Sequence, residues 1–596
     1  KNIVKHLEYK FNMEKSYNKL TDKLLQKFKN IVGEKYFFTQ YEVRFCYAFG
    51  GYIFNKNWIP DLILIPQTTV QISEILKLAN ESKIPVTPRG SGTSLSSGSL
   101  TPYGGIVLDL SQMNKIMNID IINNVVEVEP GVICDDLNQL LQPKGYFFPP
   151  DPGSSSVCTI GGMVASNAGG IQAFKYGVTK NYVLYLEVVL PSGKIINLGT
   201  KVLKSVSSYN LKDLFIGSEG TLGVITKIGL RIRPLPKLRK LGFFIFDDLK
   251  QLQDAVIEIR KKGIVPNLLE FMDKVILNAV ADYLGEEFLD FPTGYVLLAE
   301  IDGNSTKEVE NNFSVMLDVI IQKNPIFYKV AMNDKERARL ILARKANLPA
   351  LSRIRPNTCV EDCTIQISDF AEVIKKIEKI PDAINAKNLL VATICHMEGN
   401  LHPTFLFNEN NEDDIKEFKK AVDYLYKEII IPVGGTLTGE HGIGKVKTPY
   451  LELEHGSDVI NLMVQVKELF DPNRILNPGI GKGDNKSINI ITYSREIKNY
   501  SDSLLELQCM RCGFCIATCP SKIHYLIEPY SPRGRLSILN GLVHGELKLN
   551  DTIIDILHTC TLCGLCDTTC PAGVKTSEIF EKAREIVHNY EGKNKA

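Results

Sequence analysis

Residues 88–98 read PRGSGTSLSSG, and this glycine- and serine-rich stretch decides between the common ways in which a chain folds around a phosphate. It lacks the third glycine of a Rossmann dinucleotide fingerprint, because Leu95 stands at that position. It also lacks the GxxxxGK[ST] pattern of a P-loop. A turn and the apolar run IVLDL (106–110) follow, where a Rossmann unit would place a long amphipathic helix. The stretch can still cradle phosphates with successive backbone N–H groups, because glycines permit a close approach.

Two further glycine-rich segments follow it. Residues 149–170 read PPDPGSSSVCTIGGMVASNAGG, in which prolines make a rigid turn and two glycine pairs bracket a run of small residues. Residues 217–226 read GSEGTLGVIT and lead into an apolar strand. Each segment alone is as readily a surface turn as a binding loop. The three together, in this order, favour one bound cofactor over three unrelated turns.

On these segments, the chain resembles the FAD-binding fold of the vanillyl-alcohol oxidase / p-cresol methylhydroxylase superfamily over about residues 55–235. The resemblance implies an α+β FAD domain that is not a Rossmann fold. No histidine occurs between His6 and His396, which excludes a covalent histidine link to FAD within this domain. The resemblance places the pyrophosphate on Arg89, Gly90, Ser91, Gly92, Thr93 and Ser94. It places further FAD contacts on Pro150, Asp151, Gly153, Ser154, Gly161, Gly162, Asn167, Glu219, Gly220 and Ile225.

Eight of the 14 cysteines form two copies of C-x2-C-x2-C-x3-C-P near the C-terminus. This is the pattern of two-cluster [4Fe–4S] ferredoxins, in which the fourth cysteine of each run binds the other cluster. Two structural zinc sites are the alternative, but zinc typically takes separated C-x2-C pairs and needs no third cysteine or Cys-Pro. We therefore assign one cluster to Cys509, Cys512, Cys515 and Cys570, and the other to Cys560, Cys563, Cys566 and Cys519.

Histidines and a glutamate gather in two glycine-containing turns, CHMEGNLHP (395–403) and GTLTGEHGIGK (435–445). Two imidazoles and one carboxylate with open positions suit a catalytic divalent metal. Such a metal can hold and polarise the hydroxyl of a 2-hydroxy acid, and an adjacent histidine can take its proton. For a single histidine, a satisfied core residue is the better explanation; this concentration favours a metal site.

The second region resembles the C-terminal oxidase domain of the glycolate oxidase / D-lactate dehydrogenase / D-2-hydroxyglutarate dehydrogenase family, with RILNPGIG (474–481) as a further match. The resemblance implies that His396, His402 and Glu440 hold a divalent metal (Zn, Mn or Fe), that His441 is the catalytic base and that Arg344 of LILARK binds substrate. The chain departs from the family in three ways, of which the first is Ile341 in place of the tryptophan that often follows the Leu of LILARK. His396 and His402 are six residues apart rather than the usual seven, and Val360 replaces the lysine of the 2-hydroxyglutarate enzymes. The departure at Val360 favours a monocarboxylate substrate.

Local patterns agree with a mixed α+β chain. The apolar run at 58–66 predicts a strand, and helical spacing predicts a helix over 68–82. LGFFIFDD (241–248) and GYVLLAEIDG (294–303) also predict strands, and two prolines at 233–236 predict a domain boundary. Further helices are predicted at 307–322, 334–346, 368–379 and 412–428.

We predict three main parts: an FAD-binding domain at 56–235, an α+β substrate- and metal-binding domain at 236–480, and a small, mostly α-helical ferredoxin-type domain at 504–596. Residues 1–55 are expected to form an N-terminal helical segment, solvated rather than a targeting peptide, and 481–503 a polar linker.

The 596 residues carry a formal net charge of +1, which gives no general electrostatic reason to bind nucleic acid or an anionic membrane. No apolar run approaches 18 residues, so no transmembrane helix is predicted. Clustered cysteines in a long chain indicate metal and a reducing compartment. We therefore expect the protein in the cytoplasm, or at the inner face of the membrane as a peripheral protein.

These features predict a dehydrogenase that oxidises a small D-2-hydroxy acid, D-lactate or glycolate, and passes hydride to FAD. Single electrons would leave through two [4Fe–4S] clusters to an external acceptor, such as a CCG-domain iron–sulfur subunit or a membrane quinone reached through it. The preference for the D enantiomer comes from the family resemblance alone. A flavin synthase of the alkylglycerone-phosphate synthase type has no use for an electron exit, and an oxygen-consuming oxidase would make the clusters redundant. A non-catalytic electron-transfer subunit does not need Glu440, His441 or Arg344.

Overall fold

The computed structural model describes residues 17–50, 53–54, 57–285, 288–355, 357–409, 411–481, 509, 511–525 and 527–594. The first 16 residues of the predicted N-terminal helical segment (1–55) and nearly all of the predicted linker (481–503) lie outside the described residues. In the described part of the chain, no helix combines the length and the apolar character that a membrane crossing requires.

The flavin domain begins with a four-stranded sheet in which β4 and β5 both pair in parallel with β6. The helix between β4 and β5 is capped by Thr68, whose side chain accepts a hydrogen bond from the Gln71 amide, as expected for a helix N-terminus. The predicted strand and helix are confirmed within a few residues. The sheet order is β1 (Phe37–Phe38), β4 (Leu62–Leu64), β6 (Ile106–Asp109) and β5 (Val86–Arg89), and the helix is α4 (Thr69–Ser82).

A second, antiparallel sheet of five strands completes this domain, with its core against helices α5 (Cys134–Leu141) and α6 (Ile160–Ser166). Helix α6 begins in the predicted small-residue segment, and the last strand continues directly from the predicted GSEGTLGVIT turn. The sheet order is β11 (Ile195–Gly199), β10 (Val183–Val189), β12 (Val224–Arg231), β8 (Val125–Val128) and β7 (Ile116–Asp120).

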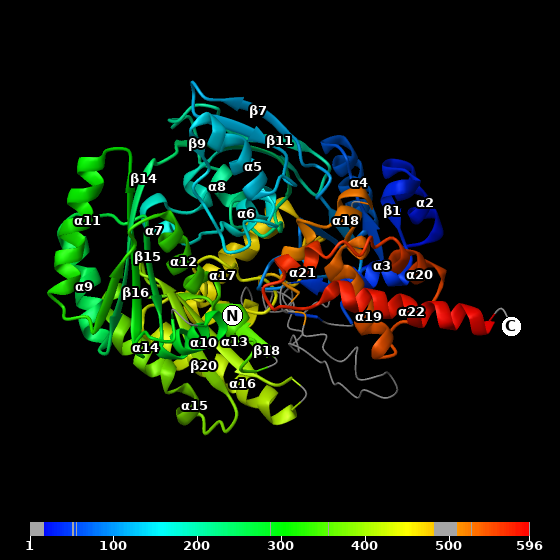
Figure 1. The fold of residues 1–596 in the computed structure, drawn as a ribbon. Helices are drawn as coiled ribbons and strands as arrows, with labels where there is room; N and C mark the ends of the chain where they lie inside the picture. The colour runs from blue at the N-terminus through cyan, green and yellow to red at the C-terminus, as the bar shows by residue number, and fades with distance from the viewer. Residues whose placement is uncertain are drawn as a thin grey trace, which may run out of the picture.

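The catalytic domain is built on an eight-stranded antiparallel sheet covered on both faces by helices (Figure 1). Alternate residues of one strand, β14 (Leu238–Phe246), enter different cores. Phe244 and Phe246 face the helices on one side of the sheet, whereas Phe243 and Ile245 face the helices on the other side. This period of two is the expected pattern for a strand buried on both faces. The strands are β17 (Phe327–Val330), β14 (Leu238–Phe246), β16 (Tyr295–Gly303), β15 (Leu268–Met272), β20 (Leu390–His396), β21 (Asn400–Phe407), β18 (Asn357–Val360) and β19 (Cys363–Thr364).

The four predicted helices of this domain are present to within a few residues, except that the last of them continues into a π-helical turn over Leu425–Ile430. The described residues of this domain also form five α-helices that were not predicted. The full set is α9 (Leu249–Lys261), α10 (Lys274–Leu284), α11 (Thr306–Ile321), α12 (Asp334–Lys345), α13 (Asn347–Leu351), α14 (Phe370–Glu378), α15 (Ile380–Ala383), α16 (Glu412–Tyr424) and α17 (Leu451–Phe470).

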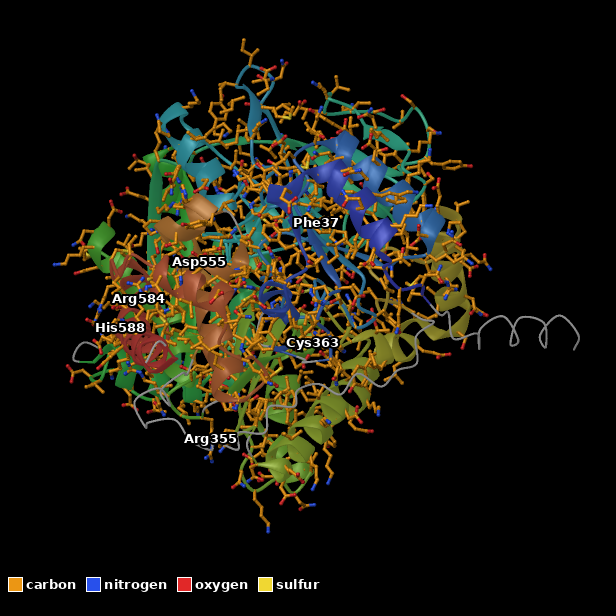
Figure 2. All side chains as sticks on the ribbon, turned by 90° about the vertical axis from the view of Figure 1, so that its right-hand side faces the viewer. Phe37, Arg355, Cys363, Asp555, Arg584 and His588 are labelled. Carbon is orange, nitrogen blue, oxygen red and sulfur yellow. The ribbon has the colours of Figure 1, made fainter. Side chains whose placement is uncertain are left out.

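The cysteine-rich domain is helical, which confirms the predicted fold class. Its helices are α18 (Pro520–Tyr525), α19 (Pro532–Val543), α20 (Asp551–His558), α21 (Leu565–Thr569) and α22 (Thr576–Asn594). Figure 2 shows Asp555 on α20 close to Arg584 on α22, and the Arg584 guanidinium donates to the carbonyl of Leu557.

The N-terminal segment differs from the helical extension that we expected. It contains α2 (Asp22–Val32) and α3 (Tyr41–Phe45), but β1 joins the first flavin sheet. Phe45 and Phe49 lie in the same hydrophobic core as Leu536 and Phe580 of the cysteine-rich domain. Figure 1 accordingly shows α3 beside α19 and α20. Because tertiary packing decides where such a short segment goes, local helical propensity alone could not reveal either role.

The proline-rich boundary is also more ordered than predicted. Pro234 belongs to a two-residue strand, β13 (Arg233–Pro234), which pairs with β9 (Tyr146–Phe147). A proline is tolerated in a two-residue strand at a sheet edge, because no backbone N–H is needed there for pairing with another strand.

Candidate functional site

The three glycine-rich segments meet at one cavity of the flavin domain. Seven of the predicted FAD contacts line it: Arg89, Gly90, Gly161, Gly162, Glu219, Gly220 and Ile225. The others lie on the same loops but are not among the lining residues: Ser91, Gly92, Thr93, Ser94, Pro150, Asp151, Gly153, Ser154 and Asn167. The three loops on which the resemblance places FAD therefore meet at one cavity.

The chemistry of this cavity fits a bound pyrophosphate. The Arg89 side chain is buried, and its Nη2 has no hydrogen-bond partner among the described residues. A buried guanidinium N–H without a partner is costly unless a ligand satisfies it. The glycines also have a packing reason: a Cβ on Gly90 would lie 2.3 Å from Thr159 Oγ1, and one on Gly161 would lie 2.5 Å from Pro130 Cβ.

The β20–β21 hairpin positions both predicted histidine ligands. His396 ends β20 and pairs with Asn400, the first residue of β21, and His402 follows two positions later on the same face. Gly399 closes the hairpin with φ +118°, a conformation that L residues rarely adopt. The six-residue spacing thus still brings the two imidazoles together, with ring centroids 5.2 Å apart.

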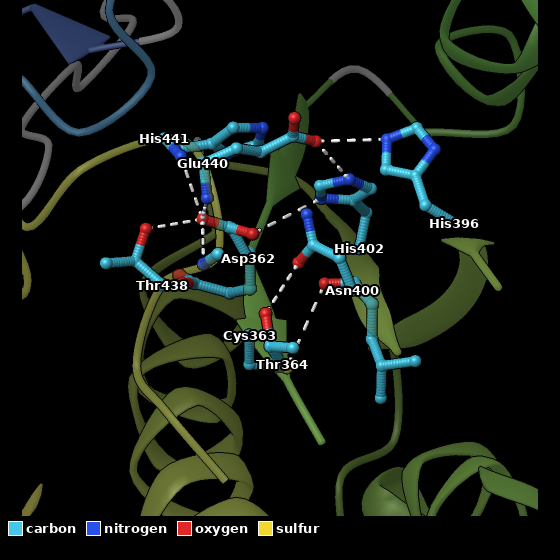
Figure 3. A network of polar contacts seen from close by, with 12 residues as sticks. Asp362, Cys363, Thr364, His396, Asn400, His402, Thr438, Glu440 and His441 are labelled. Carbon is cyan, nitrogen blue, oxygen red and sulfur yellow. Dashed lines mark hydrogen bonds and ion pairs between the residues drawn. The ribbon is translucent and has the colours of Figure 1, made fainter. Parts of the chain in front are cut away.

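Glu440 lies between these two histidines (Figure 3). Its Oε1 is 3.0 Å from Nε2 of His396 and 3.0 Å from Nε2 of His402. All three residues are largely buried. Burial would raise the pKa of Glu440, but His396 and its hydrogen bond outweigh burial and hold that pKa well below its usual range. The three predicted metal ligands are therefore together, with the carboxylate ionised.

Asp362 organises the turn that carries Glu440, although the sequence did not single it out. Its Oδ2 accepts hydrogen bonds from the amides of Gly439 (2.9 Å), Glu440 (3.0 Å) and His441 (2.9 Å), and from the Thr438 hydroxyl. Figure 3 shows these bonds converging on one carboxylate oxygen. One buried acidic side chain thus fixes the backbone of the whole TGEH turn.

Two polar atoms at this place remain without hydrogen bonds. Oδ1 of Asp362 and Nδ1 of His402 are buried, lie 3.8 Å apart and have no hydrogen-bond partner among the described residues. Potential ligand atoms come within 4.8 Å of one another in two sets that share His402: His396, His402 and Glu440, and Asp362, His402 and His441. Buried oxygen and nitrogen atoms without hydrogen bonds, next to a set of potential metal ligands, fit a site for a divalent cation.

Glu270, which sequence analysis also missed, connects the histidines to the predicted substrate arginine. Its Oε1 is 2.6 Å from Nδ1 of His396, and its Oε2 accepts a 2.6 Å hydrogen bond from Nε of Arg344. Burial would lower the pKa of His396, but Glu270 and Glu440 outweigh it and raise that pKa well above the usual value. A lone acid inside the apolar strand LLEFM (268–272) was the available signal for a buried functional carboxylate.

His441 lies beside this set and next to the flavin domain. Its ring stacks on that of His402, with centroids 4.9 Å apart and planes inclined by 12°. Its backbone carbonyl accepts a 3.0 Å hydrogen bond from the hydroxyl of Ser96, a residue of the first glycine-rich loop. Burial lowers the pKa of His441 to about 4, although Asp362 acts in the opposite direction. The imidazole is therefore neutral near pH 7, as a proton acceptor must be.

Glu219 of the flavin domain binds the same turn from the other side. Its carboxylate accepts hydrogen bonds from the amides of Ile443 (2.9 Å) and Gly444 (3.0 Å), and Lys445 donates to the carbonyl of Gly98 (2.9 Å). Burial raises the pKa of Glu219. A residue that we predicted as an FAD contact thus also docks the catalytic turn onto the flavin loops.

Replacing Glu219 by alanine is therefore expected to lower the free energy of unfolding by about 2–4 kcal/mol, because two buried amides lose their acceptor. Urea unfolding of this variant and of the wild type measures the difference. The matched control is Glu74→Ala, an exposed position on α4 where the change should stay within about 0.5 kcal/mol. Equal stability of the Glu219→Ala variant and the wild type would show that these hydrogen bonds do not hold the domains together.

The eight predicted cluster cysteines lie in two groups. Cys519 lines one cavity together with the cysteines of the second run, Cys560, Cys563 and Cys566. In the other group, burial raises the pKa of Cys509, and it raises the pKa of Cys512 to about 11. The charge of Cys570 contributes to both shifts, so Cys570 lies near these two cysteines. Each fourth cysteine therefore lies with the other run, as the ferredoxin pattern predicts.

The spacing of these sulfurs also bears on the zinc alternative. A zinc tetrahedron requires sulfurs within about 4 Å of one another, because each Zn–S bond is about 2.3 Å. Among the described residues, two sets of three potential ligand atoms lie within 4.8 Å of one another. Both sets belong to the histidine and carboxylate site, and neither contains a cysteine. The two cysteine groups thus fit a larger cubic cluster better than a single ion.

Family models match three parts of the chain. Residues 60–199 match an FAD binding domain, residues 235–480 match the C-terminal domain of FAD linked oxidases, and residues 507–574 match a 4Fe-4S dicluster domain. The FAD and iron–sulfur expectations are thereby supported independently of the cavities described above.

Characterised relatives extend this match. The glycolate oxidase subunit GlcD of Bacillus subtilis (strain 168) is 38% identical over 424 residues, which cover 71% of this chain and 88% of that protein. A D-lactate dehydrogenase of Anaerostipes hadrus is 34% identical over 78% of this chain and 98% of its own length.

Solved structures show the same fold at low sequence identity. p-Cresol methylhydroxylase has a TM-score of 0.65 and 19% identity over 78% of this chain and 98% of its own. Alkyldihydroxyacetonephosphate synthase has a TM-score of 0.62 and 19% identity over 78% of this chain and 86% of its own. The chain therefore belongs to the FAD-linked oxidase family that includes the glycolate oxidase subunit GlcD and D-lactate dehydrogenases, and it is an oxidoreductase that carries a 4Fe-4S dicluster domain.

Proposed function

We propose that this protein oxidises a small D-2-hydroxy acid, D-lactate or glycolate, to the corresponding 2-oxo acid, and that the electrons leave one at a time through two [4Fe–4S] clusters. The observation that carries the proposal is the assembly of His396, His402 and Glu440 next to a neutral His441 at the edge of the flavin loops. The names of the relatives support this class of substrate.

Each residue of the site has a separate task. His396, His402 and Glu440 would hold a divalent metal (Zn, Mn or Fe), which polarises the substrate hydroxyl when bound. His441 takes the hydroxyl proton, and Arg344, positioned by its ion pair with Glu270, binds the substrate carboxylate. Bound FAD would supply the acceptor for the hydride of the substrate Cα. Asp362 keeps the turn of Glu440 and His441 in place through its backbone hydrogen bonds.

The substrate is identified by anaerobic half-reactions. Purified protein is mixed in turn with D-lactate, glycolate, D-2-hydroxybutyrate and D-2-hydroxyglutarate, and the flavin absorbance is followed. We expect D-lactate or glycolate to bleach the flavin fastest, because Val360 replaces the lysine associated with a second substrate carboxylate. If none of the four bleaches it, the flavin synthase or the non-catalytic subunit becomes the better explanation.

The synthase alternative shares the fold, but a likeness at 19% identity supports the fold alone. The dicluster domain favours a redox enzyme, because a synthase without net redox chemistry needs no electron exit. We further propose a separate acceptor for the electrons, such as a CCG-domain iron–sulfur subunit or a membrane quinone reached through one. A position in the cytoplasm or at the inner membrane face suits that route.

Removal of the divalent metal is expected to slow flavin reduction by about 100-fold or more, because a Lewis acid of this kind contributes several kcal/mol to the barrier. Brief anaerobic chelation followed by addition of Zn²⁺, Mn²⁺ or Fe²⁺ tests this, and rate recovery identifies the metal. Elemental analysis should give one metal ion beyond the roughly eight irons of two cubic clusters. The control is the iron–sulfur absorbance, which must persist through the treatment. An unchanged rate after loss of the extra ion would exclude a catalytic metal.

A further inference from the structure

Helix α19 begins with Pro532-Arg533-Gly534-Arg535, which places one buried arginine beside each cysteine group. Arg533 and Arg535 are 2% and 0% exposed. A Cβ on Gly513, inside the first cysteine run, would lie 2.8 Å from Nη1 of Arg533. Arg535 lines the same cavity as Cys519 and the second cysteine run. The two arginines are only two positions apart on the same helix, but their hydrogen-bond partners differ.

The charge of Arg533 is neutralised, and its remaining hydrogen bonds reach the flavin domain. Its guanidinium forms a bidentate pair with Glu528, through Nε–Oε1 (2.7 Å) and Nη2–Oε2 (3.0 Å). Nη2 also donates to the carbonyl of Ser91 (2.8 Å) on the first glycine-rich loop, and Nη1 to that of Arg511 (3.4 Å) in the first cysteine run. One side chain therefore joins the first cysteine group to the predicted pyrophosphate loop.

The fourth cysteine of this group also faces the rest of the enzyme. The carbonyl of Pro571, next to Cys570, accepts a 3.2 Å hydrogen bond from the hydroxyl of Tyr283 on α10 of the catalytic domain. Among the eight cysteines only Cys563 of the second group is exposed, and the neighbouring Leu565 is 44% exposed, although Cys519 and Cys566 of that group are buried. The first group thus contacts the flavin and catalytic domains, and the second group reaches solvent through Cys563.

Arg535 has a different set of hydrogen-bond partners. It donates to the carbonyls of Tyr530 (2.7 Å) and Ile556 (2.8 Å) and to the hydroxyl of Thr559 (3.0 Å), which are all neutral acceptors. No carboxylate pairs with it in the described part of the chain. A buried, uncompensated cation acts more strongly on its surroundings than a half-exposed one, because solvent and salt screen it less.

Half-buried charges near the two groups do not reverse this difference. Arg511 lies in the first cysteine run, and near the second Arg584 donates to the carbonyl of Cys560, whereas Asp567 adjoins Cys566. These three groups are only partly buried and hence screened.

Two further buried charges adjoin the first group, because Arg89 interacts electrostatically with Arg533, Glu528 and Asp109. The formal charges of Arg89, Arg533, Glu528 and Asp109 sum to zero, whereas the buried Arg535 adds one positive charge at the second group. Lys522 interacts with Asp109 and Glu528 as well as with Cys519, so its charge is shared between the two groups.

We propose that electrons follow a fixed order, from the flavin to the cluster of Cys509, Cys512, Cys515 and Cys570, then to the cluster of Cys560, Cys563, Cys566 and Cys519, and that Arg535 directs them by raising the reduction potential of the second cluster. A nearby positive charge and solvent exposure both stabilise the more negative, reduced form of a cluster. This inference deepens the proposed function and rests on its electron route.

The electrons balance along this route. Two electrons pass one after the other from reduced flavin to the first cysteine group, and the protons that the flavin carried go to water. Each cluster gains one electron and loses it again before the next one arrives. An external one-electron acceptor takes both in turn at the second group.

A redox titration of the anaerobic holoenzyme with dithionite, followed by electron paramagnetic resonance, tests the order. Cys512→Ser and Cys563→Ser variants assign the two signals. In the wild type we expect the cluster of Cys563 to be reduced first as the potential falls. If the cluster of Cys512 is reduced first, the proposed direction is wrong, and this outcome requires no change at Arg535.

Arg535→Met then tests the cause. We expect it to lower the potential of the second cluster by 59 mV or more, a tenfold change in a one-electron equilibrium, and to leave the first unchanged. Arg535→Lys should recover most of the potential. Lys582→Met, which removes an exposed positive charge on α22, should change neither. Equal shifts in both clusters, or none, would overturn the role of Arg535.

Two measurements keep this test independent of folding and of the substrate. Iron content and the unshifted signal of the first cluster report on an intact domain, and if Arg535→Met loses its second cluster, the comparison moves to Arg535→Gln, which retains hydrogen-bond donors but no charge. Dithionite replaces the hydroxy acid, so a wrong substrate leaves the titration unaffected. Conversely, a reversed order of potentials leaves the hydroxy-acid proposal standing.

Discussion

The His441→Ala variant is expected to keep its bound FAD and to lose reduction of that FAD by the hydroxy acid by about 10²–10⁴-fold, the usual contribution of a general base. His441 is placed to take the hydroxyl proton, because its ring stacks on that of His402 in the ligand set. Burial, which lowers its pKa to about 4, leaves the imidazole unprotonated. FAD should stay because His441 is not among the residues that line the flavin cavity. Anaerobic stopped-flow absorbance measures the rate, and the flavin-to-protein ratio measures retention.

The matched control for this experiment is His524→Ala, which removes an exposed imidazole in the cysteine-rich domain. Its rate of flavin reduction should equal that of the wild type. If His441→Ala reduces its flavin at the wild-type rate, another group takes the proton, and Asp362, which also belongs to the neighbouring set of potential ligands, becomes the next residue to test.

The Cys512→Ser variant is expected to reduce its flavin normally with the hydroxy acid and to lose electron transfer to a protein acceptor. The cluster of the first group needs four thiolates, and Cys512 lies with Cys509 and Cys570 in that group. The catalytic site should be unaffected, because Cys512 contributes to none of the sets of ligand atoms there. The measurement compares flavin bleaching with reduction of cytochrome c, a protein acceptor that cannot enter the flavin cavity.

A cysteine outside the two groups provides the control. Cys359→Ser on β18 changes a thiol of the catalytic domain and should leave both half-reactions intact. Unchanged transfer to cytochrome c in Cys512→Ser would remove the clusters from the electron path. Loss of flavin reduction in the same variant would instead mean that the cysteine-rich domain supports the flavin site structurally, for example through the hydrogen bond from Arg533 to Ser91.

Local sequence patterns predicted the parts of the site that a short segment can encode. The turns around Gly90, Gly161 and Gly220 converge on one cavity, and the histidines of one hairpin meet Glu440 of a later turn. Spacing within a few residues limits the geometry of each turn and of the hairpin, so these segments could be recognised one by one. Their assembly into one cavity and one ligand set was implied by the family resemblance.

The carboxylates that hold these parts together could not be predicted in the same way. Asp362 binds the amide of Glu440 from 78 positions away, and Glu270 reaches His396 across 126 positions. Such partners depend on the order of strands in the sheet, which places β15 next to β20. Strand order is a property of the whole domain, and periodicity within one strand does not report it.

The shared core of the cysteine-rich domain constrains when the enzyme can mature. Phe45 and Phe49 pack with Leu536 and Phe580, and Cys46 contacts the carbonyl of Gly534, 488 positions further along the chain. During synthesis, Phe45 and Phe49 cannot complete this core until residues up to Phe580 have been made. The cysteine-rich domain, expressed without residues 45–49, would leave part of its apolar interior facing water.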